Sequence, residues 1–158
     1  MVTQRTATSA DISSLWDLRT RAVRETCASH YTDELLAAWA AAPMPASMPR
    51  MAEAGWALAA EDEGGLVGYA MVDLELGEVD AVFVDPAHQG RGIGRRLLRA
   101  LEEMAAAHGY GRVFLTASLN AVPFYRSAGY DPVRDELHDH RSGLKIPAVY
   151  MEKHLARG

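Results

Sequence analysis

A short run of glycines and arginines holds the residues with the clearest chemical potential in this sequence. In the segment Gln89-Gly90-Arg91-Gly92-Ile93-Gly94-Arg95, three glycines alternate with other residues just before a strongly helical pattern. Glycine accepts positive φ and lets a ligand approach the backbone closely. The start of a helix directs unpaired N–H groups and a positive partial charge outward. With Arg91, Arg95 and Arg96 nearby, the segment is predicted to bind an anion such as phosphate or pyrophosphate.

The usual nucleotide-binding fingerprints do not fit this loop. A P-loop needs a lysine followed by Ser or Thr at its end, and the segment has neither. A dinucleotide fingerprint needs Gly-x-Gly-x-x-Gly. If the fingerprint starts at Gly90, the position of its third glycine is occupied by Arg95. If it starts at Gly92, that position is occupied by Leu97. A nucleotide-binding domain is therefore disfavoured, while a plain tight turn between a strand and a helix stays open as an alternative.

Regular elements on both sides of the loop indicate how it would be positioned. A strand is predicted at Glu78–Val84, and apolar residues with helical spacing follow from Ile93 to Ala105, with a stop near Gly109. Arg112–Ala117 is rich in Val, Phe, Leu and Thr, which favours another strand. Strand, helix and strand form a βαβ unit, so the two strands are expected to be parallel.

The rest of the chain is interpreted as two helices, a loop, an antiparallel meander and a final pair of strands. The further predicted elements are strands at Val2–Ala7, Trp56–Glu61, Leu66–Leu74, Tyr130–Leu137 and Lys145–Lys153, helices that begin at Ser9-Ala10-Asp11 and at Thr32, and a short helix over Asn120–Ala128. Three prolines crowd the stretch 43–54, which is expected to be a loop. The expected fold class is α/β (α+β) with a mixed central sheet, in one domain over residues 1–158.

Composition narrows the class of protein. The chain has 158 residues with 16 basic and 21 acidic side chains, a net charge of −5, which argues against a nonspecific nucleic-acid binder. No apolar run approaches the roughly 20 residues of a membrane helix, and residues 1–5 lack the layout of a signal peptide. Cys27 is the single cysteine, so an intramolecular disulfide is excluded and a cytoplasmic location is expected.

Three stretches of this sequence recur together in one known family. Gln89-Gly90-Arg91-Gly92-Ile93-Gly94 fits the pattern Gln/Arg-x-x-Gly-x-Gly/Ala, and Ala81-Val82-Phe83-Val84-Asp85-Pro86 stands where a strand leads into it. The later segment 120–130 carries Asn, Phe-Tyr and Gly-Tyr at the expected spacing. Together they resemble the GNAT superfamily of acyl-CoA-dependent N-acyltransferases. The resemblance implies a GNAT-like sheet with an antiparallel N-terminal meander, splayed parallel strands and helices on both faces.

The same resemblance implies a binding site for acetyl-CoA. The pyrophosphate would rest on the backbone of the glycine loop, and the pantetheine arm would lie where the strands Glu78–Val84 and Arg112–Ala117 splay apart. Asn120 would contact that arm, although a plain cap of the short helix is the alternative. No metal is expected in the site. The implied cosubstrate-binding residues are Phe83, Val84, Gln89, Gly90, Arg91, Gly92, Ile93, Gly94, Arg95 and Asn120.

The implied reaction is the direct attack of a neutral amine on a thioester carbonyl. Tyr125 matches the tyrosine that donates a proton to the leaving thiolate, and a phenol with a pKa of about 10 carries that proton at neutral pH. The alternative for Tyr125 is aromatic packing beside Phe124. Glu78 would act as the general base, or Asp80, which is two residues on and so expected on the same sheet face. A third interpretation has no dedicated base.

The remaining polar residues are assigned to specificity or to structure. Specificity for the amine is expected from the first two helices, the segment 27–31 between them, and the final strands. His138-x-His140 has a metal-like spacing, but further ligands are not evident, so a polar hairpin loop is expected. Cys27 is expected to be a small core or pocket residue. Three large apolar residues are expected to pack in the core or line an apolar pocket: Trp39, Met44 and Met48.

The sequence therefore predicts an N-acetyltransferase that transfers an acetyl group from acetyl-CoA to a primary amine of a small molecule or peptide. A non-catalytic acyl-CoA binding or sensing module with the same fold is the alternative. Neither a nucleic acid nor a membrane is expected as a partner. The resemblance also implies a homodimer, because dimers are common in that family.

Overall fold

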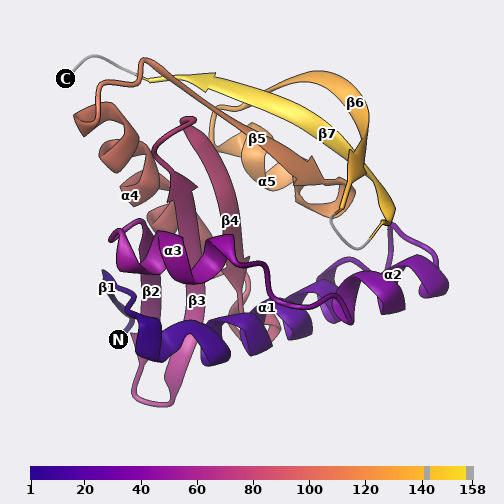
Figure 1. Ribbon diagram of the computed structural model, residues 1–158, viewed down its shortest axis with the longest axis horizontal. Coiled ribbons are helices and arrows are strands. Elements are labelled where there is room, and N and C mark those ends of the chain that lie inside the picture. The colour runs from indigo at the N-terminus through magenta and orange to yellow at the C-terminus, as the bar shows by residue number, and fades with distance from the viewer. Residues whose placement is uncertain (141–142, 156–158) are drawn as a thin grey trace.

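Seven strands form one mixed sheet in the computed structural model, which describes residues 1–140 and 143–155. Their order is β1-β2-β3-β4-β5-β7-β6, with β4 and β5 parallel and the other neighbours antiparallel (Figure 1). The strands are β1 Thr3–Thr6, β2 Ala57–Asp62, β3 Gly65–Asp73, β4 Glu78–Val84, β5 Arg112–Ser118, β6 Asp131–Asp139 and β7 Lys145–His154. The predicted mixed sheet, with its meander and its parallel βαβ unit, is confirmed.

Helices cover both faces of the sheet, as predicted. On one face, α1 packs against β3 and β4, and α3 packs against β3; on the other, α4 lies across β2 to β5. The helix α5 packs against β5 and β6, and α2 packs against α1. In Figure 1, α3 crosses in front of the meander strands, and α1 crosses in front of them lower in the view. The helices are α1 Ile12–Thr26, α2 Asp33–Ala40, α3 Ser47–Glu53, α4 Ile93–Ala107 and α5 Val122–Ser127.

The long helix α4 forms where the apolar spacing predicts it. Its buried stripe includes Leu97, Leu98 and Leu101, each at most 1% exposed, which pack into the core beneath the sheet. The helix begins after Gly92, at φ 78°, and ends before Gly109, at φ 100°. Both glycines hold left-handed backbone that other residues rarely adopt, so they fix the two ends of the helix.

The expectation of a loop over residues 43–54 is wrong, because α3 occupies Ser47–Glu53. Pro49 is the third residue of that helix, in the first turn, where the missing N–H would have no intrahelical acceptor anyway. Met48, Met51 and Ala52 are buried at helical spacing and pack on the core below α1. The apolar spacing therefore forms a helix despite the prolines, because a helix tolerates proline in its first turn.

The two halves of the sheet separate after a single contact. β4 and β5 pair at one position only, Glu78 opposite Phe114. Beyond it β4 stays on β3, with Tyr69 opposite Phe83 and Gly68 opposite Val84, while β5 stays on β7 along its whole length. The predicted splay of these strands is confirmed, and it opens the sheet between them.

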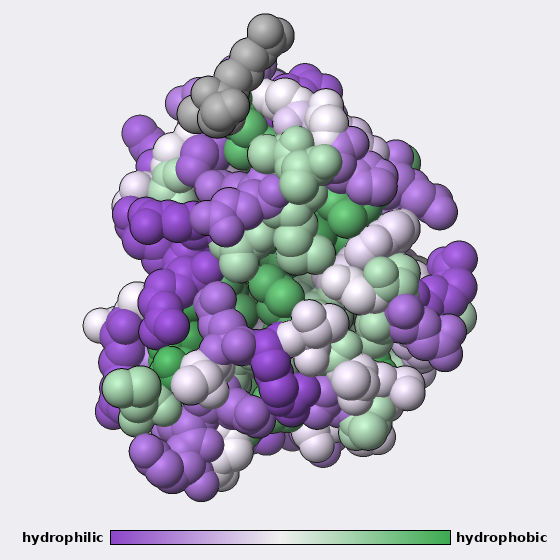
Figure 2. Space-filling view, turned by 90° about the vertical axis from the view of Figure 1, so that its left-hand side faces the viewer, coloured by the Kyte–Doolittle hydropathy of each residue, from purple (hydrophilic) through white to green (hydrophobic). Residues whose placement is uncertain are grey.

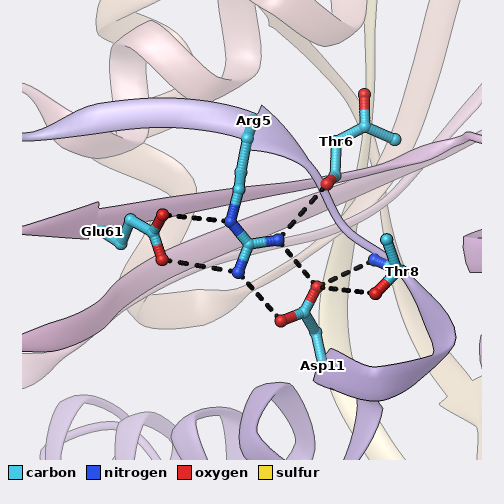
Figure 3. Close-up of polar contacts among 5 residues, drawn as sticks. All are labelled: Arg5, Thr6, Thr8, Asp11 and Glu61. Atoms are coloured by element: carbon cyan, nitrogen blue, oxygen red, sulfur yellow. Dashed lines mark hydrogen bonds and ion pairs between the residues drawn. The ribbon is translucent and has the colours of Figure 1, made fainter.

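A cluster of polar contacts fixes the N-terminal strand to the rest of the meander (Figure 3). The Arg5 guanidinium donates to both carboxylate oxygens of Asp11, at 2.8 and 2.9 Å, and to Glu61 at 3.0 Å. Asp11 also accepts from the backbone N–H of Thr8 at 2.8 Å, which caps the turn that leads into α1. The hydrogen bonds from Arg5 hold the pKa of Asp11 down to about 2.

This cluster predicts a pH-dependent contribution to stability. At pH 7, Asp11→Asn should lower the free energy of unfolding by about 1 kcal/mol, because the charged bonds to Arg5 are lost. The Asp11 pKa is about 2 in the folded chain against an ordinary 3.8, so the stabilisation is present above about pH 4 and lost as pH falls towards 2. Urea titrations at pH 7 and pH 2 measure it.

The exposed Asp17 on α1 offers a matched control, since Asp17→Asn removes a carboxylate from the same helix region. The control should lose little stability at either pH. An Asp11→Asn deficit of the same size at pH 7 and pH 2 would show that the charge of Asp11 is not its cause.

Among the described residues, no helix combines the length and the apolar character that crossing a membrane requires. The face drawn in Figure 2 mixes both kinds of side chain, with apolar ones gathered in a central band between hydrophilic edges. Few large apolar side chains are exposed in the part of the chain that the structure describes: Met1, Leu76, Val133 and Leu137. Isolated exposures of this kind are normal on a folded domain.

Candidate active site

A cavity of about 1050 Å³ lies where β4 and β5 separate. It is bordered by the start of α4, by residues of α1, α2 and α3, and by the segment that connects β5 to α5. Ten of the residues that the sequence singled out line it together: Phe83, Val84, Gln89, Gly90, Gly92, Ile93, Gly94, Arg95, Asn120 and Tyr125. Arg91 and Glu78 are not part of its lining, whereas Asp80 is.

The glycine loop leaves its backbone open to the cavity. Gly90 and Gly92 have φ of 79° and 78°, and a Cβ placed on either would meet nothing within 4 Å. Left-handed backbone is therefore what requires glycine at both positions, and the space beside them stays clear for a ligand. The first N–H groups of α4 have no intrahelical acceptor and point towards this end of the helix. This geometry is suited to an anion.

Two side chains tie the loop to its surroundings. The Gln89 side-chain amide donates to the Val84 carbonyl oxygen at 3.1 Å, which closes the loop onto the end of β4. Arg95 donates to the Ser127 hydroxyl at 2.7 Å, and that hydroxyl donates to the Phe124 carbonyl oxygen. These bonds connect the start of α4 to α5, so the glycine loop and Tyr125 share one rigid frame.

Asn120 lies inside the turn Leu119–Ala121, and the helix-cap alternative for it is not observed. The residues at the cap positions of that turn and of α5 are Ser118 and Ala121. The Oδ1 atom of Asn120 is buried and has no hydrogen-bond partner within the described chain. A buried acceptor without a donor is costly, so this atom fits the N–H of a bound ligand.

Tyr125 is held rigidly at the cavity wall. It is 8% exposed, and its ring makes edge-to-face contacts with Phe124 and Tyr130, with centroids 5.1 and 5.6 Å apart. The Tyr130 hydroxyl is fixed in turn by the Glu102 carboxylate, which also accepts from Lys153. Burial raises the pKa of Tyr125 well above its ordinary value, so the phenol keeps its proton at neutral pH.

Glu78 and Asp80, the two carboxylates considered as bases, do not follow the regular alternation of side chains along β4. A β-bulge at this point pairs Val79 with Val72 and Ala81 with Met71, and Asp80 is the extra residue between these two pairs. Val79 packs in the core under α4, whereas Ala81, two residues on, packs in the core under α1. The alternation therefore breaks at Asp80.

Glu78 carries the most perturbed carboxylate pKa in this region. Burial, with the charges of Asp80 and Asp73, raises the pKa of Glu78 to about 7. A carboxyl group that titrates near neutrality can accept a proton at physiological pH and is well matched to general-base chemistry. It lies where β4 and β5 meet, at the base of the open seam.

The histidine pair and the cysteine also line the cavity. His138 and His140 do so at the end of β6, and no three His, Cys, Asp or Glu side chains in residues 1–140 and 143–155 are grouped to hold a metal ion. Cys27 is 3% exposed, and burial raises the pKa of its thiol, which disfavours the reactive thiolate. Trp39 and Met48 line the cavity, while Met44 packs against the core under α1.

Several cavity residues were missed as site residues by sequence reasoning, among them Trp16, Arg19, Tyr69 and Met71. The sequence predicted Trp16 only as part of the apolar stripe of the first helix, and it predicted only that the aliphatic stem of Arg19 lies on the same stripe. Tyr69 and Met71 alternate on β3 and so share one face, which is the pattern that could have pointed to them. Their position in the cavity depends on packing between α1 and β3, which sequence spacing does not specify.

A family model for the acetyltransferase (GNAT) domain matches residues 27–155 of this sequence. The chain belongs to the GNAT family. Its resemblance to that family in the glycine loop and the segment 120–130 is thereby confirmed. The region matched includes β2 to β7, the glycine loop and Tyr125, so the cavity described above lies almost wholly within the GNAT domain.

Relatives of known name support acetyl transfer as the family activity. The N-alpha-acetyltransferase RimI of Mycobacterium tuberculosis is 44% identical over 84 residues, which cover 47% of this chain and 51% of RimI. The mycothiol acetyltransferase of Nocardiopsis dassonvillei is 39% identical over 90 residues, which cover 56% of this chain and 27% of that protein. The chain thus spans about half or less of the length of these relatives.

Solved structures share the GNAT fold over nearly the whole chain. A GCN5-related N-acetyltransferase from Rhodopseudomonas palustris matches with a TM-score of 0.87 and 26% identity, covering 97% of this chain and 95% of that one. The PaiA N-acetyltransferase of Thermoplasma acidophilum, solved in complex with coenzyme A, matches with a TM-score of 0.78 and 18% identity, covering 98% and 99%. The second match bears on the fold alone.

Proposed function

We propose that this GNAT domain transfers an acetyl group from acetyl-CoA to a primary amine by direct attack within a ternary complex. The observation that carries the proposal is that one cavity joins the open glycine loop, the seam between β4 and β5, and the buried phenol of Tyr125. An anion site, a slot beside unpaired strand backbone and a proton donor are the three parts that acyl transfer from a thioester of coenzyme A needs.

Different residues of the chain would bind different parts of acetyl-CoA. The backbone of Gly90 and Gly92, with the first turn of α4, would hold the pyrophosphate, and Arg95 would add positive charge. The edge of β4 at Phe83 and Val84 would pair with the amides of the pantetheine arm, and the buried Oδ1 of Asn120 would accept from one of them. The edge of β4 that faces the seam and the unpartnered Oδ1 of Asn120 fit the amides of the cosubstrate.

The chemistry needs two proton transfers from the protein. Acetyl-CoA supplies a thioester whose carbonyl carbon bonds to the amine nitrogen while the carbon–sulfur bond breaks and its electron pair leaves with the sulfur. Tyr125 would donate its proton to that sulfur, for which a protected phenol is suited. Glu78 would take the proton that the amine nitrogen loses, through a water molecule because its carboxylate lies outside the cavity lining.

The raised pKa of Glu78 predicts the pH dependence of the reaction. A general base must be deprotonated, so kcat/KM should rise with pH through about 7 and then level off. Glu78→Gln should lower turnover at pH 7 by about tenfold. It should also abolish that rise, because the glutamine side chain does not titrate in this pH range. Steady-state rates of thiol release between pH 5.5 and 9 measure both effects.

Asp80→Asn separates the two carboxylates. If Glu78 is the base, this variant should keep the rise but move it to lower pH, since the charge of Asp80 helps to raise the Glu78 pKa. If Asp80 is the base, the rise should disappear in Asp80→Asn and persist in Glu78→Gln. A rise that survives in both variants means that neither carboxylate serves as the base.

The full chain tests the proposed function itself. Calorimetry should detect acetyl-CoA binding, and a thiol-release assay over a panel of amines should detect turnover. Binding without turnover on any amine would favour the non-catalytic acyl-CoA sensor. An absence of acetyl-CoA binding would contradict both functions.

A further inference from the structure

The acceptor side of the cavity has an apolar wall that four elements build together. The wall consists of Trp16 of α1, Met48 of α3, Tyr69 and Met71 of β3, and Phe83 of β4. All five belong to, or pack against, the core on the sheet face beneath α1, across β4 from the seam with β5. Met48, Tyr69 and Met71 are each 2% exposed. The wall therefore lies on the α1 side of β4, and only Phe83 belongs both to it and to the strand edge assigned to the pantetheine arm.

This wall is braced before any ligand arrives. The Tyr69 and Phe83 rings pack with centroids 5.6 Å apart, as neighbours on paired strands. The Arg19 guanidinium, 4% exposed, lies 4.3 Å from the centre of the Trp16 ring. It also donates to the carbonyl oxygens of Trp39 and Ala40, at 3.0 and 3.3 Å, at the end of α2. Trp16 is thus held between two helices, and the apolar surface is pre-formed.

Negative charge in the cavity is sparse. Among the described lining residues, the carboxylates are Asp80 and Asp139, and Asp139 forms an ion pair with Lys145. Asp80 lines the cavity beside this wall, since it stands on β4 next to Ala81, which packs against the same core. The same lining holds the guanidinium groups of Arg19 and Arg95, so its described side chains have no excess of negative charge to balance a polycation. A polyamine or an aminoglycoside would bring several positive charges that this lining does not neutralise.

We propose that the acceptor is a monoamine whose nitrogen is joined by a short chain to a flat apolar group, of which an aromatic ring is the best fit. The ring would lie on the wall of Trp16, Met71 and Phe83, and the ammonium would approach past Asp80 before it loses its proton. A free arylalkylamine and the N-terminus of a peptide that begins with an aromatic residue share this chemistry. The proposal rests on the proposed acetyl transfer and adds the substrate class.

The first experiment compares amines on the full chain at saturating acetyl-CoA. The panel is 2-phenylethylamine, n-propylamine, spermidine, kanamycin and a short peptide with an N-terminal phenylalanine, followed by thiol release. The expected result is a kcat/KM at least about tenfold higher for 2-phenylethylamine or the peptide than for n-propylamine, spermidine or kanamycin. Whichever of the two aromatic substrates is faster identifies the source of the amine.

A pair of matched variants tests the wall directly. Trp16→Leu should raise the KM for the better aromatic substrate by about tenfold and leave its kcat within about threefold, because the ring loses a contact that it makes equally before and during reaction. The KM for n-propylamine should rise less than the KM for the aromatic substrate, because n-propylamine has no ring to lie on the wall. The control is Trp56→Leu, since Trp56 is also half-buried and packs against the cores but does not line the cavity. Circular dichroism melts confirm that both variants fold.

Direct binding keeps this proposal separate from the proposed function. Calorimetry of 2-phenylethylamine against the protein loaded with coenzyme A should give a measurable affinity that Trp16→Leu weakens and that spermidine does not match. Turnover that prefers spermidine, kanamycin or n-propylamine would overturn the substrate class and leave acetyl transfer intact. Failure of acetyl-CoA to bind would instead overturn the proposed function. Binding of acetyl-CoA with neither turnover nor 2-phenylethylamine binding would overturn both the substrate class and the enzyme.

Discussion

Tyr125→Phe should lower turnover by about 10²-fold or more and leave acetyl-CoA affinity nearly intact. The phenylalanine keeps the ring contacts with Phe124 and Tyr130, so the wall of the cavity should hold its shape. What it removes is a proton donor whose pKa burial holds high enough to stay protonated at neutral pH. The leaving thiolate then has to take its proton from water. Steady-state kinetics and calorimetric titration with acetyl-CoA measure the two quantities.

Tyr110→Phe is the matched control for that experiment. The Tyr110 hydroxyl donates to the Leu74 carbonyl oxygen at 2.7 Å, away from the cavity lining. Its loss should cost about 1 kcal/mol of stability and leave turnover unchanged. Unchanged turnover in Tyr125→Phe would remove Tyr125 from the acid role, and an equal loss in both variants would indicate a general structural effect.

Gly92→Asp should weaken acetyl-CoA binding by about 10²-fold or more. Gly92 stands at the start of α4 in left-handed backbone, with open space where a side chain would extend. A carboxylate there would lie beside the bound pyrophosphate, and two like charges about 4 Å apart near a protein surface repel by roughly 4 kcal/mol. Calorimetry or a fluorescence titration gives the dissociation constant.

Gly92→Asn isolates the charge in that prediction. Asparagine has nearly the same shape as aspartate and is among the residues that tolerate left-handed backbone, so both variants carry similar strain. We expect the neutral variant to lose about tenfold or less in affinity, and the gap between the two should narrow at high salt. Equal affinity in Gly92→Asp and the unmodified chain would show that the phosphates bind elsewhere.

Much of the fold could be predicted because its determinants are local. The helix after the glycine loop is set by a stripe that includes Leu97 and Leu101, and glycines mark its ends. The meander is set by short polar turns between apolar runs, and β4 was predicted with its observed bounds, Glu78–Val84. The helix α3 was missed because prolines were weighed as breaks without regard to position, although Pro49 falls in a first turn.

The two ends of the cavity differ in how well they could be predicted from the sequence. The glycine loop is contiguous, so its residue types and spacing state its chemistry directly. The acceptor wall brings together Trp16, Met48 and Tyr69 from elements far apart in the chain, and only packing unites them. The bulge at Asp80 arises from the register between β3 and β4, which alternation within one strand does not reveal.

The seam between β4 and β5 also bears on how this domain unfolds. One residue pair is the only ladder contact that joins the two halves of the sheet along this seam in residues 1–140 and 143–155. A ligand that lies in it and pairs with β4 therefore acts as a missing strand and couples two sub-structures that could otherwise open separately. At a hundredfold excess over its dissociation constant, such a ligand adds about 2.7 kcal/mol to the folded state. A cosubstrate bound as proposed would thus be a structural member of the sheet as well as a reactant.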